Sequence, residues 1–263
     1  MSAYEKFDLA GKRILLVGAT GVLGRGYANA MVRCGARLAI ADREQSDVLD
    51  FAKMIGATGV EIDVADESSV IAGVERTVAA LGGLDGAVAN AAATGEFLMK
   101  EGDAFAAFEE YPLAVWQRTI DVNLTGTFLV AREAGRAMKA GGGGSLVTVS
   151  SIYGLVGPDH RIYEDQPFKS FAGYSASKAG VIGLTRWLAT WWGRDGLRVN
   201  CITPGGVYND HDPSFAEAYA NRTPMGRMAD REDLIGMVLF LLSDASAYCT
   251  GQNFVVDGGF TSW

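Results

Sequence analysis

A tyrosine and a lysine four residues apart are the side chains of this sequence best suited to moving a proton. They are Tyr174 and Lys178, in the stretch GYSASKAG (173–180). On a helix this spacing places both on one face. A cation about 4 Å from a phenol, at an effective dielectric constant of about 20, favours the phenolate by roughly 4 kcal/mol, or about three pKa units. We therefore expect Lys178 to lower the pKa of Tyr174 enough for proton exchange with an alcohol or carbonyl oxygen.

Two further polar groups extend this pair to a candidate catalytic set. A loop and strand predicted over residues 141–151 end in Ser150 and Ser151, and a long predicted helix (115–140) carries Asn123. A serine hydroxyl beside the phenol would donate a second hydrogen bond to the substrate oxygen. Alternation along a strand turns one serine towards the site and the other away. The alternative is a helix with an ordinary Tyr–Lys pair after a strand that happens to end in serine.

A glycine-rich turn near the N-terminus favours nucleotide binding. Gly18, Gly21 and Gly24 separate an apolar strand (13–18) from a helix (25–35). At such a turn the backbone approaches a pyrophosphate closely, and the free N–H groups and dipole of the helix favour the negative charge. Glycines also punctuate ordinary strand–helix turns, but the strand before and the helix after agree with the nucleotide interpretation.

The choice of dinucleotide depends on Asp42, which ends the second predicted strand (37–42). A carboxylate there accepts hydrogen bonds from an adenosine ribose and repels a 2′-phosphate, which favours NAD over NADP. Arg25 and Arg43 point the other way if either guanidinium reaches a 2′-phosphate; otherwise both are solvated surface arginines. Asp63, which ends the third strand, is either a ligand of the adenine amino group or a plain strand-end acid.

Short apolar runs alternate with amphipathic segments along the chain, and several runs are apolar on both faces. This pattern is typical of a parallel sheet covered by helices on both sides. Strands are predicted over 13–18, 37–42, 59–64, 85–92, 141–151 (after its loop), 197–206 and 252–259. Helices are predicted over 25–35, 47–56, 66–82 (capped by Asp66), 115–140, 171–193 and 231–244. We expect one doubly wound α/β domain with a seven-stranded parallel sheet over residues 1–263.

The composition argues against several classes of function. A formal net charge of −8 and a pI near 4.9 are unfavourable for binding nucleic acids or anionic membranes. No stretch reaches 18 uninterrupted apolar residues, and none has the form of a signal peptide. Cys34, Cys201 and Cys249 form no CxxC motif, as is typical of reduced thiols in a cytoplasmic protein. His160 and His211 have no partners at ligand spacing, so no metal site is expected.

The order of these motifs resembles that of the short-chain dehydrogenase/reductase family, in its single-domain branch, over nearly the whole chain. The landmarks are the glycine turn (18–24), Asp42, Asp63, ANAA (89–92), Asn123, SS (150–151), YSASK (174–178), PGG (204–206) and VDGG (256–259). The resemblance implies a Rossmann-like fold and hydride transfer between a nicotinamide dinucleotide and an alcohol or ketone carbon.

The same resemblance implies a role for each candidate residue. Tyr174 would be the general acid or base, and Ser151 would orient the substrate oxygen. Lys178 would also bind the nicotinamide ribose, and Asn123 would hold a water in a proton relay. Ser151 is preferred to Ser150 because the serine of this family is followed by two residues and a glycine, as in SIYG. The implied cofactor-binding residues are Gly18, Thr20, Gly21, Val22, Leu23, Gly24, Asp42, Arg43, Asp63, Val64, Asn90, Ala91, Tyr174, Lys178, Pro204, Gly205 and Val207.

The sequence departs from the family pattern around the cofactor rather than at the reacting groups. Val17 stands where many members have threonine, and Val22 where single-domain members usually have their middle glycine, so the GxxGxxG spacing is like that of a larger branch that handles sugar nucleotides. Ala89 and Ala92 replace the asparagine and glycine of NNAG, and Asn209 stands where a threonine often contacts the nicotinamide carboxamide. These differences bear on the geometry and affinity of cofactor binding.

Two connections are longer than is usual in the family, over residues 94–114 and 157–173. The second lies between Ser151 and Tyr174, and we interpret it as a polar lid over a polyhydroxylated or acidic substrate such as a sugar, polyol or sugar acid. A solvated loop, or one used in subunit contacts, is an equal alternative. Steroids and long acyl chains fit so charged a rim less well. Its ionisable side chains are Asp159, His160, Arg161, Glu164, Asp165 and Lys169.

Surplus aromatic surface on the predicted helix 171–193 indicates self-association. One side of the helix must cover the sheet, and the rest suggests a contact between subunits. Because the family commonly forms tetramers through this helix and the one before it, we expect a homotetramer or a homodimer. The side chains concerned are Leu184, Trp187, Leu188, Trp191 and Trp192.

Taken together, these features predict an NAD-dependent dehydrogenase or ketone reductase for a small polar alcohol. An NADP(H)-dependent carbonyl reductase, including a 3-oxoacyl-thioester reductase, is the alternative among enzymes. A dinucleotide-binding regulator without turnover is the alternative from another class, although such a protein has no need of a complete catalytic set.

Overall fold

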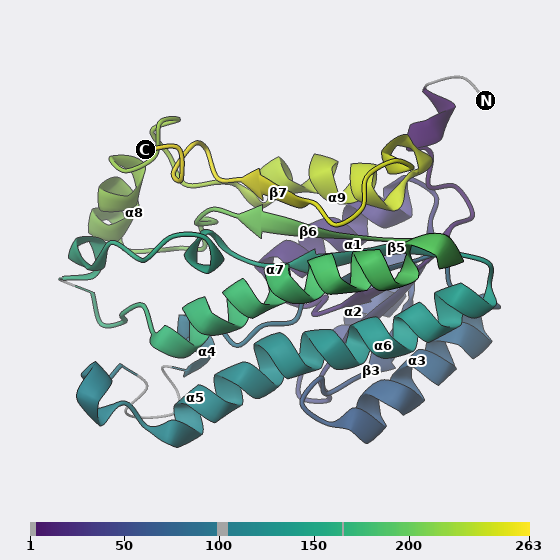
Figure 1. Cartoon of the computed structure of the whole chain (residues 1–263), viewed down its shortest axis with the longest axis horizontal. Helices are drawn as coiled ribbons and strands as arrows, with labels where there is room; N and C mark the ends of the chain where they lie inside the picture. The colour runs from purple at the N-terminus through teal and green to yellow at the C-terminus, as the bar shows by residue number, and fades with distance from the viewer. Residues whose placement is uncertain (1–3, 99–104, 165) are drawn as a thin grey trace.

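The computed structural model describes residues 4–98, 105–164 and 166–263, and its centre is a parallel β-sheet (Figure 1). The described strands follow the order β3-β2-β1-β4-β5-β6-β7, and every neighbouring pair is parallel. The predicted fold class, a doubly wound seven-stranded sheet, is confirmed. The strands are β1 (Arg13–Val17), β2 (Arg37–Asp42), β3 (Thr58–Glu61), β4 (Gly86–Ala89), β5 (Gly144–Val149), β6 (Leu197–Pro204) and β7 (Asn253–Val256).

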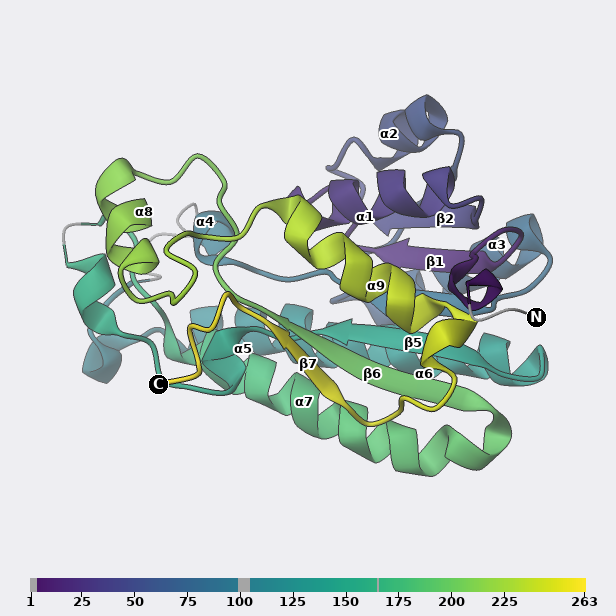
Figure 2. The ribbon, with the colours of Figure 1, turned by 90° about the horizontal axis from the view of Figure 1, so that it is seen from above.

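Helices cover both faces of the sheet, as the view along the layers shows (Figure 2). One face carries α1 (Val22–Arg33), α2 (Val48–Ile55) and α9 (Ile235–Leu242). The other carries α3 (Glu67–Leu81), α6 (Gly126–Ala140) and α7 (Ala172–Trp192), with α5 (Leu113–Ile120) leading into α6. Two short helices, α4 (Gly95–Leu98) and α8 (Pro213–Ala220), lie at one end of the sheet.

The strands are apolar on both sides because each side is buried under helices. Along β1, Leu15 and Val17 join the core under α3, α6 and α7, whereas Ile14 and Leu16 join the core under α1 and α9. Successive side chains of a strand point to opposite faces, so an unbroken apolar run is needed to fill both cores. Trp192 is buried in the first of these cores.

The predicted helix 115–140 is wrong in one respect, because it is not one regular helix. A π-helical turn over Asp121–Thr125 joins α5 to α6 and contains the buried Asn123. Such turns insert one residue into a helix, and side-chain periodicity hardly reveals them. Other differences concern ends: strands 59–64 and 85–92 stop at Glu61 and Ala89.

One predicted helix cap is confirmed, and one helix was not predicted. Asp66 caps α3 as predicted, since its carboxylate accepts hydrogen bonds from the backbone N–H groups of Ser68 and Ser69. The helix α8 was not predicted; Asp212 caps it and Pro213 is its first residue, a favourable start. None of the described helices is both long enough and apolar enough to cross a membrane.

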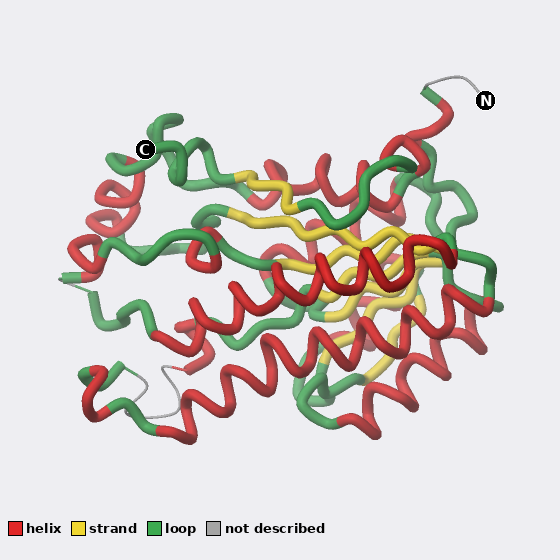
Figure 3. Tube along the Cα trace, viewed as in Figure 1, coloured by secondary structure: helices red, strands yellow, loops and turns green. Residues whose placement is uncertain are grey.

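The carboxyl ends of the strands meet at one edge, where the loops gather (Figure 3). The chain leaves β1 and β4 towards opposite faces, and ligands of doubly wound sheets bind at such a reversal. Gly18 follows β1, Asn90 follows β4, and Ser150 and Ser151 follow β5. This edge is therefore the place to look for a functional site.

Substitutions at two glycines of the first turn test how tightly it is built. A Cβ at Gly24 would lie 2.2 Å from the Gly18 carbonyl oxygen, whereas a Cβ at Gly21 would approach nothing closer than 3.9 Å. We expect Gly24→Ala to lower the free energy of unfolding by about 2–3 kcal/mol or more, because backbone must move. In a chain of this size that lowers Tm by roughly 4–10 °C. Gly21→Ala is the matched control, and its thermal melt should overlay that of the wild type; equal losses in both would contradict the packing argument.

Candidate active site

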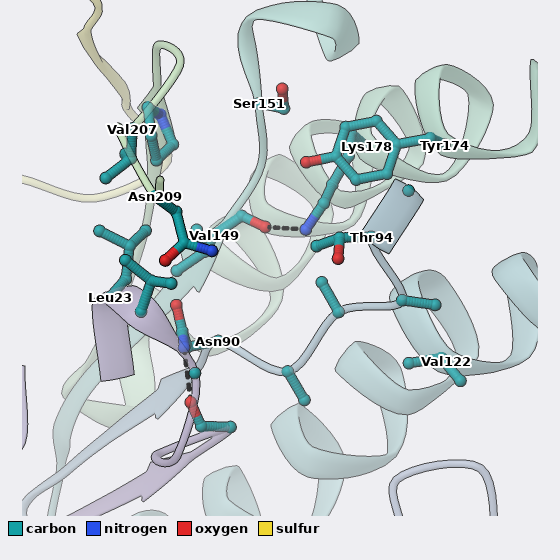
Figure 4. A pocket seen from close by; sticks show the side chains of 18 of the residues that line it. Leu23, Asn90, Thr94, Val122, Val149, Ser151, Tyr174, Lys178, Val207 and Asn209 are labelled. Carbon is teal, nitrogen blue, oxygen red and sulfur yellow. Dashed lines mark hydrogen bonds between the residues drawn. The ribbon is translucent and has the colours of Figure 1, made fainter. Parts of the chain in front are cut away.

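A cavity of about 790 Å³ opens at the carboxyl edge of the sheet (Figure 4). Of the predicted cofactor-binding residues, all except Gly24 line it, and Ser151, Tyr174 and Lys178 line it too. Gly24 instead lies buried under the turn. The cavity thus joins the nucleotide turn to the proton-transfer residues in one space.

Asp42 holds the glycine turn against the end of β2. Its Oδ2 accepts hydrogen bonds from the Thr20 backbone N–H at 3.0 Å and from the Thr20 hydroxyl at 2.7 Å, and its Oδ1 accepts one from the Arg43 N–H at 2.9 Å. An ionised carboxylate has about four acceptor positions. These three bonds therefore orient Asp42 and leave capacity for a ribose hydroxyl.

The two arginines considered as 2′-phosphate ligands lie in different surroundings. The Arg25 guanidinium forms an ion pair with Asp47 at 2.6 Å, donates from Nε to the Thr20 carbonyl, and lies 4.6 Å from the centre of the Phe51 ring. It does not line the cavity, whereas Arg43 does. Of the two arginines, Arg43 therefore lines the cavity, whereas Arg25 is held by Asp47 and the Thr20 carbonyl.

The start of α1 offers donors to an anion. Among the described residues no side chain caps this helix, whose N-cap is Gly21, and its first turn has no acidic residue. The first N–H groups of a helix lack partners within it and favour negative charge. Thr20 to Leu23 line the cavity at this point, so a pyrophosphate fits the turn.

Residues that follow three further strands also border the cavity. Asp63 and Val64 line the cavity after β3. After β4, the Asn90 amide donates to the Gly18 carbonyl at 2.8 Å and so braces the glycine turn. Asn209, which replaces the usual threonine, also lines the cavity, and Figure 4 shows its side chain directed into it.

Ser151, Tyr174 and Lys178 gather where β5 ends and α7 begins. Figure 4 shows the Tyr174 hydroxyl pointing into the space between Ser151 and Lys178. The Lys178 ammonium donates to the Val149 carbonyl at 2.9 Å and lies 5.7 Å from the centre of the Tyr174 ring. Ser150 points elsewhere, since its hydroxyl donates to the Lys178 carbonyl within the protein. The choice of Ser151 over Ser150 agrees with this arrangement.

The electrostatics of the pair differ from the expectation. Burial raises the pKa of Tyr174, and the nearby Ser151 hydroxyl acts weakly in the opposite direction. Burial also lowers the pKa of Lys178 to about 8. The expected lowering of the Tyr174 pKa is therefore wrong for these residues alone, because burial of the phenol is the larger influence.

Asn123 lies behind the cavity rather than on its lining. It is fully buried; its Oδ1 accepts from the Ala93 N–H at 2.7 Å, and its Nδ2 donates to the Ala93 carbonyl and the Ser177 hydroxyl. These bonds clamp the segment after β4 to α7. The π-helical turn is what brings its side chain to both.

The part of the cavity lined by residues from 151–164, 166–174 and 205–228, which we call the substrate end, carries many aromatic side chains. Most of these side chains were not predicted from the sequence, because they come from the loop before α7 and from α8 and belong to no sequence motif. Only Tyr153 could have been found from the sequence, because it lies two residues after Ser151. The aromatic side chains of the substrate end, in addition to Tyr174, are Tyr153, Tyr163, Phe168, Phe171, His211, Phe215 and Tyr219.

The loop 157–173 does not present its charges to the substrate end as expected. Of its charged side chains only Lys169 lines the cavity, and Asp165 lies outside the described residues. Asp159 forms ion pairs with Arg161 at 2.7 Å and Arg222 at 3.2 Å, and the Arg161 guanidinium lowers the pKa of that carboxyl to about 2. These ion pairs hold the charged groups of Asp159 and Arg161 outside the cavity. The short 3₁₀ turn His160–Tyr163 directs the Tyr163 side chain into the cavity.

Metal-binding groups do not accompany this cavity. In residues 4–98, 105–164 and 166–263, no cluster of three or more His, Cys, Asp or Glu side chains could hold a metal ion.

Comparisons with known proteins agree with the geometry. A family model described as enoyl-(acyl carrier protein) reductase matches residues 18–261. The chain is 36% identical over 260 residues to cis-4-hydroxycyclohexanecarboxylate dehydrogenase of Sinomonas cyclohexanicum, covering 94% of this chain and 96% of that one. It is 33% identical over 265 residues to D-threitol dehydrogenase of Mycolicibacterium smegmatis, covering 97% and 95%.

Solved structures show the same likeness in space. A gluconate 5-dehydrogenase from Burkholderia cenocepacia, in complex with NADP and tartrate, superposes with a TM-score of 0.86 at 27% identity, over 100% of both chains. With the family model spanning nearly the whole sequence, the chain belongs to the short-chain dehydrogenase/reductase family of oxidoreductases, which act on CH–OH groups.

Proposed function

We propose that this protein is an NAD-dependent dehydrogenase of a small polar secondary alcohol, which also reduces the corresponding ketone, and that residues 1–263 act as one catalytic domain. The observation that carries the proposal is the single cavity that contains Asp42 and the glycine turn at one end and Ser151, Tyr174 and Lys178 at the other. A dinucleotide bound along this edge supplies the hydride acceptor or donor.

Tyr174 exchanges the proton with the substrate oxygen. In alcohol oxidation its phenolate accepts the hydroxyl proton, and in ketone reduction its phenol donates one. Ser151 donates a second hydrogen bond to the same oxygen; the Tyr153 N–H already donates to the Ser151 Oγ at 3.3 Å and so helps to hold it. Lys178 supplies positive charge near the phenol and a donor to the ribose.

Asn123 acts in this proposal as a positioning residue. Its bonds to Ala93 and Ser177 hold the wall of the cavity opposite α7. The water relay expected from the family would run beside it to Lys178. We propose that relay on the resemblance alone.

The substrate proposed is a sugar, a polyol or a sugar acid. One relative is named for a polyol and a solved relative for gluconate, which supports this class. Hydroxyl and amide groups at the substrate end, those of Tyr153, Tyr163 and Asn209 among them, offer hydrogen bonds to such molecules. The relative named for a hydroxycyclohexane carboxylic acid adds a ring-shaped hydroxy acid to the candidates, which the aromatic walls would accommodate.

Two other functions compete with this proposal. An NADP(H)-dependent carbonyl or 3-oxoacyl-thioester reductase is favoured by Arg43 on the cavity wall and by the NADP in the solved relative. A dinucleotide-binding regulator would need no proton donor. The grouping of Ser151, Tyr174 and Lys178 around one space argues against it.

We also propose that the protein is a cytoplasmic homodimer or homotetramer. The three cysteines form no disulfide, as suits a reducing compartment. On α7 the rings of Trp187 and Trp191 stack 5.3 Å apart and are 57% and 65% exposed. Phe128 on the neighbouring α6 is 42% exposed. Together these rings form an apolar face of the kind that subunits bury.

Removing the phenol hydroxyl of Tyr174 tests whether the protein is an enzyme that uses this residue as its acid or base. Tyr174→Phe should reduce kcat for alcohol oxidation by about 100-fold or more, because the general base is lost, while NADH still binds. In the wild type, oxidation should speed up as the pH rises, because burial raises the pKa of Tyr174 and the phenolate is the reactive form. Tyr248→Phe, at a fully exposed tyrosine, is the control. Undiminished turnover in Tyr174→Phe would refute the assignment.

Fluorescence titration with NADH and NADPH tests the cofactor. We expect tighter binding of NADH, and Asp42→Asn should narrow the preference by about tenfold, since the amide keeps an acceptor for Thr20 but loses the charge that repels a 2′-phosphate. Glu44→Gln, an exposed acid near Asp42 that does not line the cavity, controls for net charge. Tighter NADPH binding by the wild type would favour the reductase alternative.

Light scattering at micromolar concentration tests self-association. The wild type should have the mass of a dimer or tetramer, and Trp187→Ser combined with Trp191→Ser should have a smaller mass because the stacked rings are removed. Trp263→Ser removes another exposed tryptophan, at the C-terminal end, and should not change the mass. A monomeric wild type would end the proposal of a homo-oligomer.

A further inference from the structure

Two phenols face each other at the substrate end, and the proposed proton transfer uses neither. Tyr153 lies in a 3₁₀ turn (Ile152–Gly154) directly after Ser151, and Tyr163 ends another in the loop (His160–Tyr163). Their hydroxyl oxygens are 2.7 Å apart, a hydrogen bond in which either may be the donor. Both side chains line the cavity.

The pair lies close to the reacting groups. The backbone N–H of Tyr153 donates to the Ser151 Oγ. Both phenols line the same cavity as Tyr174. An oxygen bound by the pair would therefore belong to the same small substrate whose reacting oxygen meets Ser151 and Tyr174.

The pair has one hydrogen to give. Each hydroxyl carries one hydrogen, and the bond between them uses only one of the two. The other has no acceptor among the described residues, whichever phenol donates. Burial raises the pKa of Tyr163 to about 12 and that of Tyr153 further, so both are protonated at neutral pH. One O–H group and several lone pairs thus remain for a ligand.

The apolar groups around the pair make this free O–H hydrogen a determinant of which ligands bind. Ring centres of Phe168 and Phe215 lie 5.8 Å and 5.4 Å from that of Tyr163 and offer no hydrogen bond. The Lys169 ammonium donates to the carbonyls of Tyr163 and Glu164 and so braces the turn that carries the phenol. A polar group held in an apolar wall discriminates against ligands that leave it unpaired.

We infer that the Tyr153–Tyr163 pair binds a second hydroxyl oxygen of the substrate, close to the reacting carbon, and so makes the protein select diols and polyols over simple alcohols. This rests on the proposed function, since it supposes that a secondary alcohol is oxidised at Tyr174. It assigns a specificity role to two residues that no motif marks.

Matched substrate pairs test the inference. Oxidation of 1,2-cyclohexanediol is compared with cyclohexanol, and 2,3-butanediol with 2-butanol, each with NAD and with NADP. In the wild type, kcat/KM should favour the diol by about tenfold or more. Tyr163→Phe and Tyr153→Phe should each bring the ratio towards one, because KM should rise more for the diol than for the simple alcohol.

The outcomes separate the two proposals. A wild type that oxidises alcohols but shows no diol preference in either pair overturns the inference, as does a preference that survives both substitutions. This comparison within the wild type holds even if a variant fails to fold. A wild type that oxidises no alcohol with either dinucleotide overturns the proposed function itself. Tyr27→Phe, at a buried tyrosine away from the cavity, is the control for loss of a hydroxyl and should keep the wild-type ratio.

Discussion

In a parallel sheet all strands run in one direction, so the segments that follow β1, β4, β5 and β6 emerge at one edge. Gly18, Asn90, Ser151 and Gly205 meet around a single cavity for this reason, although they are far apart in the sequence. The burial of β1 and its neighbours on both faces keeps this edge rigid, and loops need only supply side chains. Everything proposed about dinucleotide and substrate depends on this common direction.

The end of β5 contributes to the site in two ways. It supplies Ser151, and its Val149 carbonyl binds the Lys178 ammonium at 2.9 Å. A buried cation is unfavourable, as the lowered pKa of Lys178 shows, and a carbonyl at the strand end offsets part of that desolvation. Strand and helix therefore have to keep their register for the lysine to remain charged beside Tyr174.

Much of the architecture follows from local patterns. Apolar runs predicted the strands, because both faces of each strand are buried, and the predicted glycine turn lies on the wall of the cavity. The Tyr–Lys pair proposed for catalysis was identified from its spacing together with the motifs around it, but its pKa values depend on burial, which spacing does not reveal. The aromatic wall formed by Phe168, Phe215 and Tyr219 could not be predicted from the sequence for a similar reason. These side chains come together only because α8 packs against the loop before α7.

The π-helical turn at Asp121–Thr125 has a consequence for how the family's long helix tolerates change. One extra residue in a turn rotates everything before it by about 100° relative to everything after it. In this protein that rotation lets α5 bury Val115 and Thr119 on its own side while α6 buries Leu129 and Val130 against the sheet. The number of residues in this turn is thus constrained, as is the identity of Asn123 within it, whose buried amide bonds Ala93 and Ser177. A deletion there would restore an even helix and turn one of the two buried faces out to water.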